Sequence, residues 1–307
     1  MPSIAYFGPR GTFTEQAALT YAKPTDTLTP VKTVPLALAA VRAGEADLAC
    51  VPVENSVEGA VSATMDALAV DEPLVAVAEV VLPVRFSVLV RPGLATADVR
   101  TVASHPHALA QVQDWLGEHL PGVTQVAANS TAGAAVGVAD GEWDAAVTAP
   151  VAATHYPLVV LATGVADLAG AVTRFLLLRR PGELPAPTGS DRTSIVAVAT
   201  AERTGVLAEM LTELALRGIN LSRIESRPQK GRLGQYRFYL DFDGHVVEQR
   251  VGDALAALHR RCQQLRFLGS YPKAEPGPPS VTATAGNTDA DYAAANQWLT
   301  TVLGGRY

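Results

Sequence analysis

The chain has 307 residues, enough for about two domains at ~150 residues each. Hydrophobic residues make up 48% of the chain and charged residues 18%, so a sizeable core can be buried. The net charge of −6 and the pI near 5.5 exclude a general nucleic-acid-binding protein, which would carry a basic face. An anionic ligand would therefore have to be attracted by local groups, not by the overall field of the protein.

Cys50 and Cys262 are far apart and have no companion at CxxC spacing, which favours free thiols in a reducing compartment. The first residues lack the basic and apolar regions of a secretory signal. The most apolar stretch, residues 158–172, is interrupted by two glycines and an aspartate, so we expect no membrane span. These features predict a cytoplasmic protein.

Residues 1 to about 180 alternate short strand-forming runs with alanine-rich helical runs. The predicted strands are 3–7, 48–53, 74–82, 86–90, 99–103 and 145–148. The predicted helices are 15–22, 35–43, 63–69, 106–118 and 132–140. This alternation indicates an α/β domain with mostly parallel sheets.

A second pattern follows residues 181–191, which are rich in proline and glycine and predict a linker. The predicted elements after it are a strand at 193–200, a helix at 204–217, strands at 220–227 and 235–242, a helix at 247–261 and a strand at 265–271. The order βαββαβ predicts an α+β ferredoxin-like domain over 192–271. The composition of 272–307 predicts a largely disordered tail, in which 292–303 can form a short helix.

Polar residues gather in the strand-to-helix turns of the first domain. Thr12 with Glu15, and Asn55 with Glu58, have the spacing of a capping box. The candidate ligand-binding residues in these turns are Thr12, Asn55, Ser56, Ser104, His105, Ser130 and Thr131. Such turns lie at the carboxyl ends of the strands, where helix N-termini can hold anions. Capping alone explains any one of these turns, but several facing one cleft would bind carboxylates without many lysines.

The same turns carry a resemblance to a known family. Its motifs here are Gly8-Pro9-x-Gly11-Thr12-Phe13-Thr14, Val51-Pro52-Val53-Glu54-Asn55-Ser56-x-Glu58-Gly59, Ser104-His105-Pro106, Ser130-Thr131-Ala132 and Thr173-Arg174-Phe175. Their order and spacing resemble prephenate dehydratases. Gly218-Ile219-Asn220-Leu221 and Ile224-Glu225-Ser226-Arg227-Pro228 resemble the ACT regulatory domain attached to those enzymes. The match runs from about residue 3 to 271.

The resemblance implies a catalytic domain over 1–180, made of two α/β lobes similar to periplasmic binding proteins. Lobe one would comprise about 1–77 and 160–180, and lobe two about 78–159. The implied reaction converts prephenate into phenylpyruvate, carbon dioxide and water in L-phenylalanine biosynthesis. Loss of carbon dioxide from C1 and of hydroxide from C4 makes the ring aromatic, so no electron-sink cofactor is needed.

Catalytic roles follow from the same resemblance. Thr173 would donate a hydrogen bond or relay a proton to the leaving hydroxyl, because general acid catalysis is the difficult requirement. Arg174 would bind a substrate carboxylate through its guanidinium, and Phe175 would pack the cleft wall. Without the resemblance, Thr173 is an ordinary strand threonine and Arg174 a surface arginine. The histidine spacing shows no metal-ligand set, and the chain has neither a P-loop nor a GxGxxG motif.

For the second domain the resemblance implies a site for L-phenylalanine as allosteric effector. The expected contacts are Gly205, Leu207, Asn220, Leu221, Glu225 and Ser226. ACT domains pair side by side, so we expect a homodimer or homotetramer. The chain departs from the family pattern at His107, where glutamine is usual, and at Thr204 and Val206, where proline and alanine are usual.

Two alternatives remain open at this level. Arogenate, the amino analogue of prephenate, would suit the same site, and no residue in the sequence decides between the two substrates. A cytosolic sensor of small anions, without catalysis, could also join a binding-protein fold to an ACT domain. Such a sensor would not need the Thr173-Arg174-Phe175 motif just before the linker.

Overall fold

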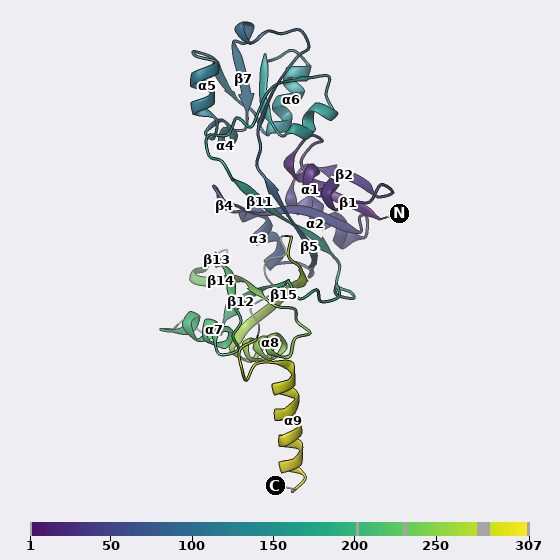
Figure 1. The fold of residues 1–307 in the computed structure, drawn as a ribbon, viewed down its shortest axis with the longest axis vertical. Coiled ribbons are helices and arrows are strands. Elements are labelled where there is room, and N and C mark those ends of the chain that lie inside the picture. Colours follow the sequence, from purple (N-terminus) through teal and green to yellow (C-terminus); the bar gives the residue numbers. More distant parts are fainter. Residues whose placement is uncertain (1, 201–202, 230–231, 275–282, 306–307) are drawn as a thin grey trace. The chain divides into compact units, whose positions relative to one another are not determined.

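The computed structural model describes residues 2–200, 203–229, 232–274 and 283–305 (Figure 1). The chain divides into two compact units, each built from two stretches of sequence. The first unit comprises Met1–Ala67 and Val80–Arg179, and the second comprises Leu68–Glu79 and Arg180–Tyr307. Residues 68–79, which the sequence pattern assigned to the first domain, therefore belong with the second unit.

The first lobe of the first unit is built on one mixed sheet in the order β2-β1-β3-β11-β5, with β4 paired to β3. Its strands are β1 Ser3–Phe7, β2 Thr27–Val31, β3 Leu48–Asn55, β4 Gly59–Ala60, β5 Val75–Pro83 and β11 Val172–Arg179. Its helices are α1 Phe13–Tyr21, α2 Val34–Ala43 and α3 Ser62–Ala69. Strand β1 runs parallel to β2 and β3, whereas β11 runs antiparallel to β3. The expectation of mostly parallel sheets is wrong here, because β11 is a returning strand and not the end of a βαβ crossover.

The second lobe is also a mixed sheet, in the order β10-β6-β9-β7-β8. Its elements are β6 Ser87–Val90, β7 Thr101–Ser104, α4 Pro106–Leu109, α5 Gln113–His119, β8 Thr124–Ala127, α6 Thr131–Ala139, β9 Ala145–Thr148 and β10 Val159–Thr163, with 3₁₀ turns at Thr96–Asp98 and Pro150–Thr154. Strand β10 pairs antiparallel with β6 and so lies in this sheet, not in lobe one as the expected boundary at 160 implied. Strand β5 crosses the expected boundary between the lobes at residues 77 and 78. All of it lies in the sheet of lobe one.

The helix expected at 106–118 is two helices. The helix is interrupted because Asp167, in the segment after β10, binds the backbone at the start of the second helix. The Asp167 carboxylate accepts hydrogen bonds from the backbone N–H groups of Gln113 (2.7 Å) and Asp114 (3.2 Å). This side chain caps a new helix start at Gln113.

In α6 the small residues allow close packing: a Cβ on Gly137 would lie 2.4 Å from the Trp143 ring.

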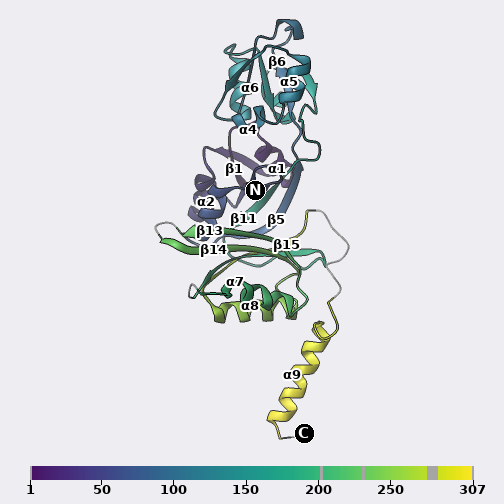
Figure 2. The same ribbon diagram turned by 90° about the vertical axis from the view of Figure 1, so that its left-hand side faces the viewer.

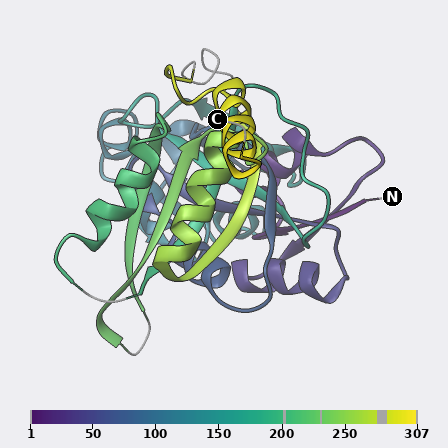
Figure 3. The same cartoon turned by 90° about the horizontal axis from the view of Figure 1, so that it is seen from below.

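The second unit contains a four-stranded antiparallel sheet in the order β13-β14-β12-β15. Its elements are β12 Asp191–Ala199, α7 Val206–Ala215, β13 Leu221–Gln229, β14 Arg232–Asp243, α8 Gln249–Arg261 and β15 Cys262–Pro272. Helices α7 and α8 lie side by side on one face of the sheet (Figures 2 and 3). Apolar side chains of both helices and the sheet form one core, including Ile195, Met210, Leu214, Leu240, Phe242, Val251 and Leu258. The element order βαββαβ is the expected ferredoxin-like one.

Residues 68–79 are held within the second unit by specific polar contacts. The Arg266 guanidinium donates to the backbone carbonyls of Leu68, Val70 and Asp71. Glu79, which is 2% exposed at its side chain, forms an ion pair with Arg192. Strand β5 is thus part of the sheet of lobe one, but its first residues, 75–79, are grouped with the second unit by their contacts.

The tail contains the expected helix, with an earlier start. Helix α9 spans Asp289–Leu303 and begins before residue 292, because Thr288 and Asp291 form a reciprocal capping box at its N-terminus. The short helix expected at 292–303 is therefore present, whereas residues 275–282 lie outside the described part of the chain. In the described residues, no helix has both the length and the apolar character needed to cross a membrane.

Candidate active site

A cavity of about 690 Å³ lies in the first unit and is lined by both lobes. Its lining includes six of the expected site residues: Thr12, Asn55, His105, Ser130, Thr131 and Thr173. This volume is in the range of small-molecule sites in proteins. The structure therefore brings together residues that are up to 161 positions apart in the sequence.

One wall is the turn between β1 and α1. Gly8 has a φ of +105° and Gly11 a φ of +87°, a region of backbone conformation that favours glycine. The Thr12 hydroxyl caps α1 by accepting from the Glu15 backbone N–H at 3.2 Å. The Glu15 carboxylate binds the N–H of Gly11 instead of that of Thr12, so only half of the expected capping box forms. The first turn of α1 thus begins at the cavity, with Thr12, Phe13 and Thr14 in its lining.

Asn55 and Thr173 face each other across the paired ends of β3 and β11. The Asn55 Oδ1 atom accepts from the backbone N–H groups of Val57 (2.8 Å) and Glu58 (3.0 Å), which fixes the orientation of the amide. The Asn55 Nδ2 atom then donates to Thr173 Oγ1 at 2.8 Å. Since that oxygen is accepting, the hydroxyl proton of Thr173 is directed elsewhere. No helix starts at Asn55, so the second expected capping box is an Asx-type turn.

The second lobe contributes two helix starts. Ser130 caps α6 by accepting from the Gly133 N–H at 2.9 Å, as expected, and Thr131 is the first residue of that helix. The cap of α4 is His105, whose Nδ1 accepts from the His107 N–H at 3.3 Å. Ser104, an expected ligand-binding residue, is fully buried and donates to the Val147 carbonyl at 2.6 Å. Ser104 therefore does not line the cavity, because its side chain points into the sheet of lobe two.

Three further expected site residues do not line the cavity. The Ser56 hydroxyl accepts from the Val172 N–H at 3.0 Å and does not line the cavity. Arg174 follows Thr173 in strand β11 and so points to the opposite face, where its guanidinium lies 3.9 Å from the Glu54 carboxylate. Phe175 is 1% exposed, packs in the protein interior and does not line the cavity.

Lys32 is a lining residue that no sequence motif indicated. It follows β2, a strand that the sequence pattern did not predict. Among the described residues that line the cavity, it is the only lysine or arginine. The Glu58 carboxylate also lines the cavity, and its Oε2 lies 3.3 Å from His107 Nδ1. A positive end of the cavity at Lys32 would attract an anion.

His105 faces the cavity with a lowered pKa. Burial is the largest cause, the nearby His107 lowers the pKa further, and the Glu58 carboxylate opposes both. A neutral imidazole whose Nδ1 accepts a hydrogen bond carries its proton on Nε2. His105 can thus donate a hydrogen bond to a ligand without carrying a charge. In the part of the chain that the structure describes, no three His, Cys, Asp or Glu residues form a group that could hold a metal ion.

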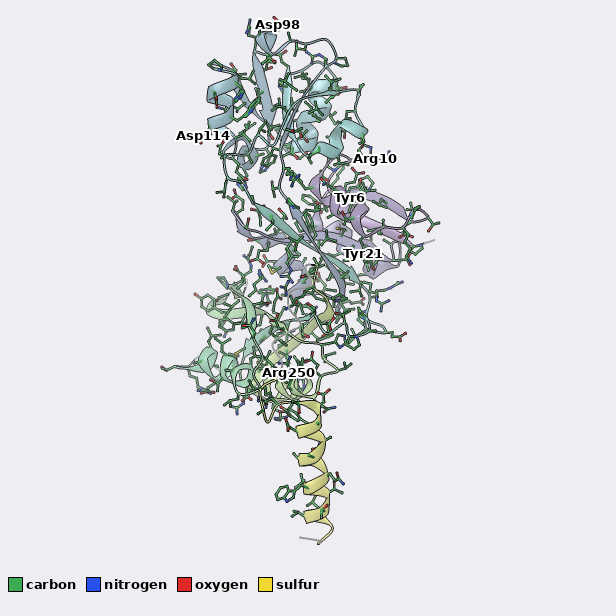
Figure 4. All side chains as sticks on the ribbon, in the orientation of Figure 1. Tyr6, Arg10, Tyr21, Asp98, Asp114 and Arg250 are labelled. Carbon is green, nitrogen blue, oxygen red and sulfur yellow. The ribbon has the colours of Figure 1, made fainter. Side chains whose placement is uncertain are left out.

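A buried carboxylate behind the β1–α1 turn was also missed. Glu15 is 4% exposed, and its carboxylate accepts from Tyr6 Oη (3.0 Å), Gly11 N (2.6 Å) and His155 Nε2 (2.9 Å). Figure 4 labels Tyr6, on strand β1, and Arg10, in the turn that follows it. Burial, followed by the charge of Glu15, raises the pKa of Tyr6. His155 is 140 positions from Glu15, so no sequence motif could have paired them.

The expected effector residues lie in two places in the second unit. Gly205, with a φ of +83°, is the N-cap of α7, and Leu207 is in its first turn. Asn220 and Leu221 lie beyond the other end of α7, about 15 Å away for a ten-residue helix at ~1.5 Å per residue. Glu225 and Ser226 lie along β13, an edge strand of the sheet. One copy of the chain therefore does not gather these six residues around one ligand.

Comparisons with known proteins agree with this architecture. A family model for prephenate dehydratase matches residues 4–183, and one for the ACT domain matches residues 193–260. The chain is 63% identical to a prephenate dehydratase from Amycolatopsis methanolica, covering 97% of this chain and 98% of the relative. It is 50% identical to one from Mycolicibacterium gilvum, covering 93% and 97%.

Solved structures with a similar fold include a member of the same family. A prephenate dehydratase from Arthrobacter aurescens in complex with L-Phe has a TM-score of 0.92 at 44% identity, covering 98% of this chain and 99% of that one. GqqA, described as a novel type of quorum quenching acylase, has a TM-score of 0.80 at 33% identity, covering 90% and 98%. The same fold therefore accompanies two differently described activities among similar proteins.

Proposed function

This chain belongs to the prephenate dehydratase family, and from that premise we propose that it is a lyase that converts prephenate into phenylpyruvate, carbon dioxide and water. The reaction is a step of L-phenylalanine biosynthesis. The observation that carries the proposal in this molecule is the hydrogen bond from Asn55 to Thr173 at the wall of a cavity large enough for the substrate.

Thr173 serves the leaving group in this proposal. Hydroxide leaves C4 readily only if it receives a hydrogen bond or a proton, and a placed donor contributes typically ~10²–10⁴-fold. Because Asn55 donates to Thr173 Oγ1, the threonine proton is free for the substrate hydroxyl, and the hydrogen bond accepted by the oxygen makes the O–H a better donor. The amide of Asn55 cannot rotate away without losing its two backbone hydrogen bonds.

The two substrate carboxylates are held by local groups. Lys32 supplies a positive charge, and the first turns of α1 and α6 present backbone N–H groups at the ends of helix dipoles. Arg174 lies next to Glu54 on the face of β11 opposite Thr173. In this proposal it supports the strand and does not bind a substrate carboxylate directly. This arrangement accounts for anion binding by a protein of net charge −6.

The ring of prephenate fits the apolar part of the cavity. Phe7, Phe13, Val84 and Phe86 are among the lining residues, and Phe13 and Phe86 meet edge to face with ring centroids 5.6 Å apart. Such walls keep water from the reacting carbon atoms and suit the aromatic product. His105, neutral near pH 7, donates a hydrogen bond to a substrate oxygen.

The deciding experiment is to incubate the purified protein with prephenate and to measure phenylpyruvate formation. Formation of no product from either prephenate or arogenate would refute the lyase proposal and favour the non-catalytic anion sensor. Thr173→Ala should lower kcat by about 10² or more, whereas Thr173→Ser, which keeps the hydroxyl, should retain much of it. Wild-type kcat in Thr173→Ala would remove Thr173 from the mechanism.

L-phenylalanine is the allosteric effector, acting through the ACT domain. We propose that Gly205 and Leu207 of one copy meet Asn220, Leu221, Glu225 and Ser226 of a second copy around each effector molecule. The separation of these residues within one chain and the edge position of β13 support this pairing. A homodimer, or a homotetramer made from two such dimers, follows. Sedimentation of the protein with and without L-phenylalanine tests it, and a monomer under both conditions would contradict it.

Domain limits and location complete the proposal. The catalytic domain comprises about residues 1–180, 181–191 form the linker and 192–271 form the ACT domain, with 68–79 attached to the latter unit. Cys50 and Cys262 are free thiols, which suits a reducing cytoplasm. The alternative substrate is arogenate, whose amino group would be favoured by a negative charge in the cavity. Among the described lining residues, only Glu58 carries such a charge. Phenylalanine formation from arogenate, measured beside phenylpyruvate formation from prephenate, tests this alternative.

A further inference from the structure

The β1–α1 turn contacts the second lobe at the peptide group between Arg10 and Gly11. The peptide between Arg10 and Gly11 has two polar atoms, and both have partners. Its carbonyl oxygen accepts from Tyr156 Oη at 2.8 Å, and its N–H donates to the Glu15 carboxylate at 2.6 Å. That carboxylate is in turn held by His155 Nε2 at 2.9 Å. Two consecutive residues of lobe two therefore fix this peptide from both sides.

The packing around this peptide leaves little freedom. Gly11 has a φ of +87°, and a Cβ placed on it would lie 3.1 Å from Ala152 and 3.1 Å from the Tyr156 ring. Glu15 is 4% exposed, and Tyr6 supplies the third hydrogen bond to its carboxylate. A buried carboxylate with three donors is held in one position, because the loss of any donor leaves a buried charge less well solvated.

None of Glu15, His155 and Tyr156 lines the cavity, but the turn that they hold does so through Gly8, Pro9 and Thr12. We propose that His155 and Tyr156 are positioning residues that couple contact between the lobes to the shape of the anion-binding turn. When lobe two is in contact with the turn, the Arg10–Gly11 peptide is fixed and the first turn of α1 faces the substrate. This inference rests on the proposed function, because the ligand of the turn is taken to be a substrate carboxylate.

The charge of Glu15 gives His155 a second effect. Glu15 lies in the first turn of α1, where an uncompensated negative charge would repel a substrate carboxylate approaching the same helix end. A donor on His155, which does not itself line the cavity, offsets part of that charge. The other titratable or charged groups around this carboxylate are Tyr6 from β1, Arg10 from the turn and Tyr156 from lobe two. Loss of His155 should therefore weaken substrate binding more than it slows the chemical step.

The test is steady-state kinetics on His155→Leu, Tyr156→Phe and the conservative variant His155→Gln, whose amide can still donate to Glu15. We expect KM for prephenate to rise about tenfold in the first two variants, which corresponds to the loss of about one hydrogen bond. We expect kcat to change less than about threefold and His155→Gln to recover most of the affinity. Tyr21→Phe, at an exposed tyrosine at the end of α1, and His259→Leu, at an exposed histidine of α8, are the matched controls.

Hydrogen exchange of the full-length protein provides a readout that does not depend on activity. The Gly11 amide should exchange about tenfold faster in His155→Leu and in Tyr156→Phe than in the wild type, since the clamp on its peptide is loosened. A wild-type protein that makes no phenylpyruvate would refute the proposed function, and the exchange rates would still test the clamp. Unchanged KM together with unchanged Gly11 exchange, in variants that unfold at the wild-type temperature, would overturn the positioning role.

Discussion

Asn55→Asp is the substitution that tests the proposed chemistry most directly. The side chain keeps its shape, and its Oδ1 still accepts from the N–H groups of Val57 and Glu58, so the turn should stay folded. The group facing Thr173 changes from a donor to an acceptor. The threonine proton, which is free for the substrate in the wild type, would then be drawn to the new carboxylate 2.8 Å away. The hydrogen bond to the leaving hydroxyl is lost.

The expected magnitude follows from what a placed donor contributes. At the lower end of the range for general acid catalysis, kcat should fall about 10²-fold, or about 2.7 kcal/mol of activation free energy. The added negative charge also repels a dianionic substrate, so KM should rise. Phenylpyruvate formation from prephenate, followed over a range of substrate concentrations, separates the two effects.

Asn129→Asp is the matched control, because Asn129 also lines the cavity and the same substitution adds the same charge there. It should raise KM but leave kcat within about threefold of the wild type, since its side chain is not the partner of Thr173. If both variants lose kcat equally, the charge and not the reversed hydrogen bond is responsible. If Asn55→Asp keeps a kcat within about threefold of the wild type, the role assigned to the Asn55–Thr173 pair is refuted.

Three further outcomes are expected. Lys32→Met should raise KM for prephenate about tenfold with little change in kcat, and the effect should shrink at high salt; unchanged KM would exclude Lys32 as a carboxylate partner. Phe175→Ala should lower the free energy of unfolding by about 3–5 kcal/mol in urea titrations, because Phe175 is buried. A fall in kcat without loss of stability would instead indicate that Phe175 lines the cleft. His105 has a lowered pKa in the folded protein, so its contribution to stability is present above the ordinary histidine pKa and is lost as pH falls through that value toward the folded pKa. Stability measured from pH 8 to 5 should therefore decline less in His105→Gln than in the wild type, and identical pH profiles would contradict this.

Most of the secondary structure was accessible from the sequence. The expected fold class is confirmed, because apolar periodicity and turn residues are local properties of the chain. Predicted helices such as 35–43 and strands such as 3–7 lie within one residue of α2 and β1. Strands β2 and β8 were missed because each is largely exposed, and the sequence therefore lacks an apolar run there. The break between α4 and α5 was invisible because its cause, Asp167, lies over 50 residues away.

The sequence by itself determined the family, the βαββαβ order of the ACT domain and the helix starts that gather around the cavity. Those features depend on residue types at fixed short spacings. Only the tertiary structure decided that Thr173 faces Asn55 while Arg174, the next residue, faces away, because strand alternation and the register of β11 on β3 set the direction of each side chain. It also placed Lys32 in the cavity and joined Glu15 to His155. These contacts depend on the packing of segments far apart in the chain, and no local pattern encodes them.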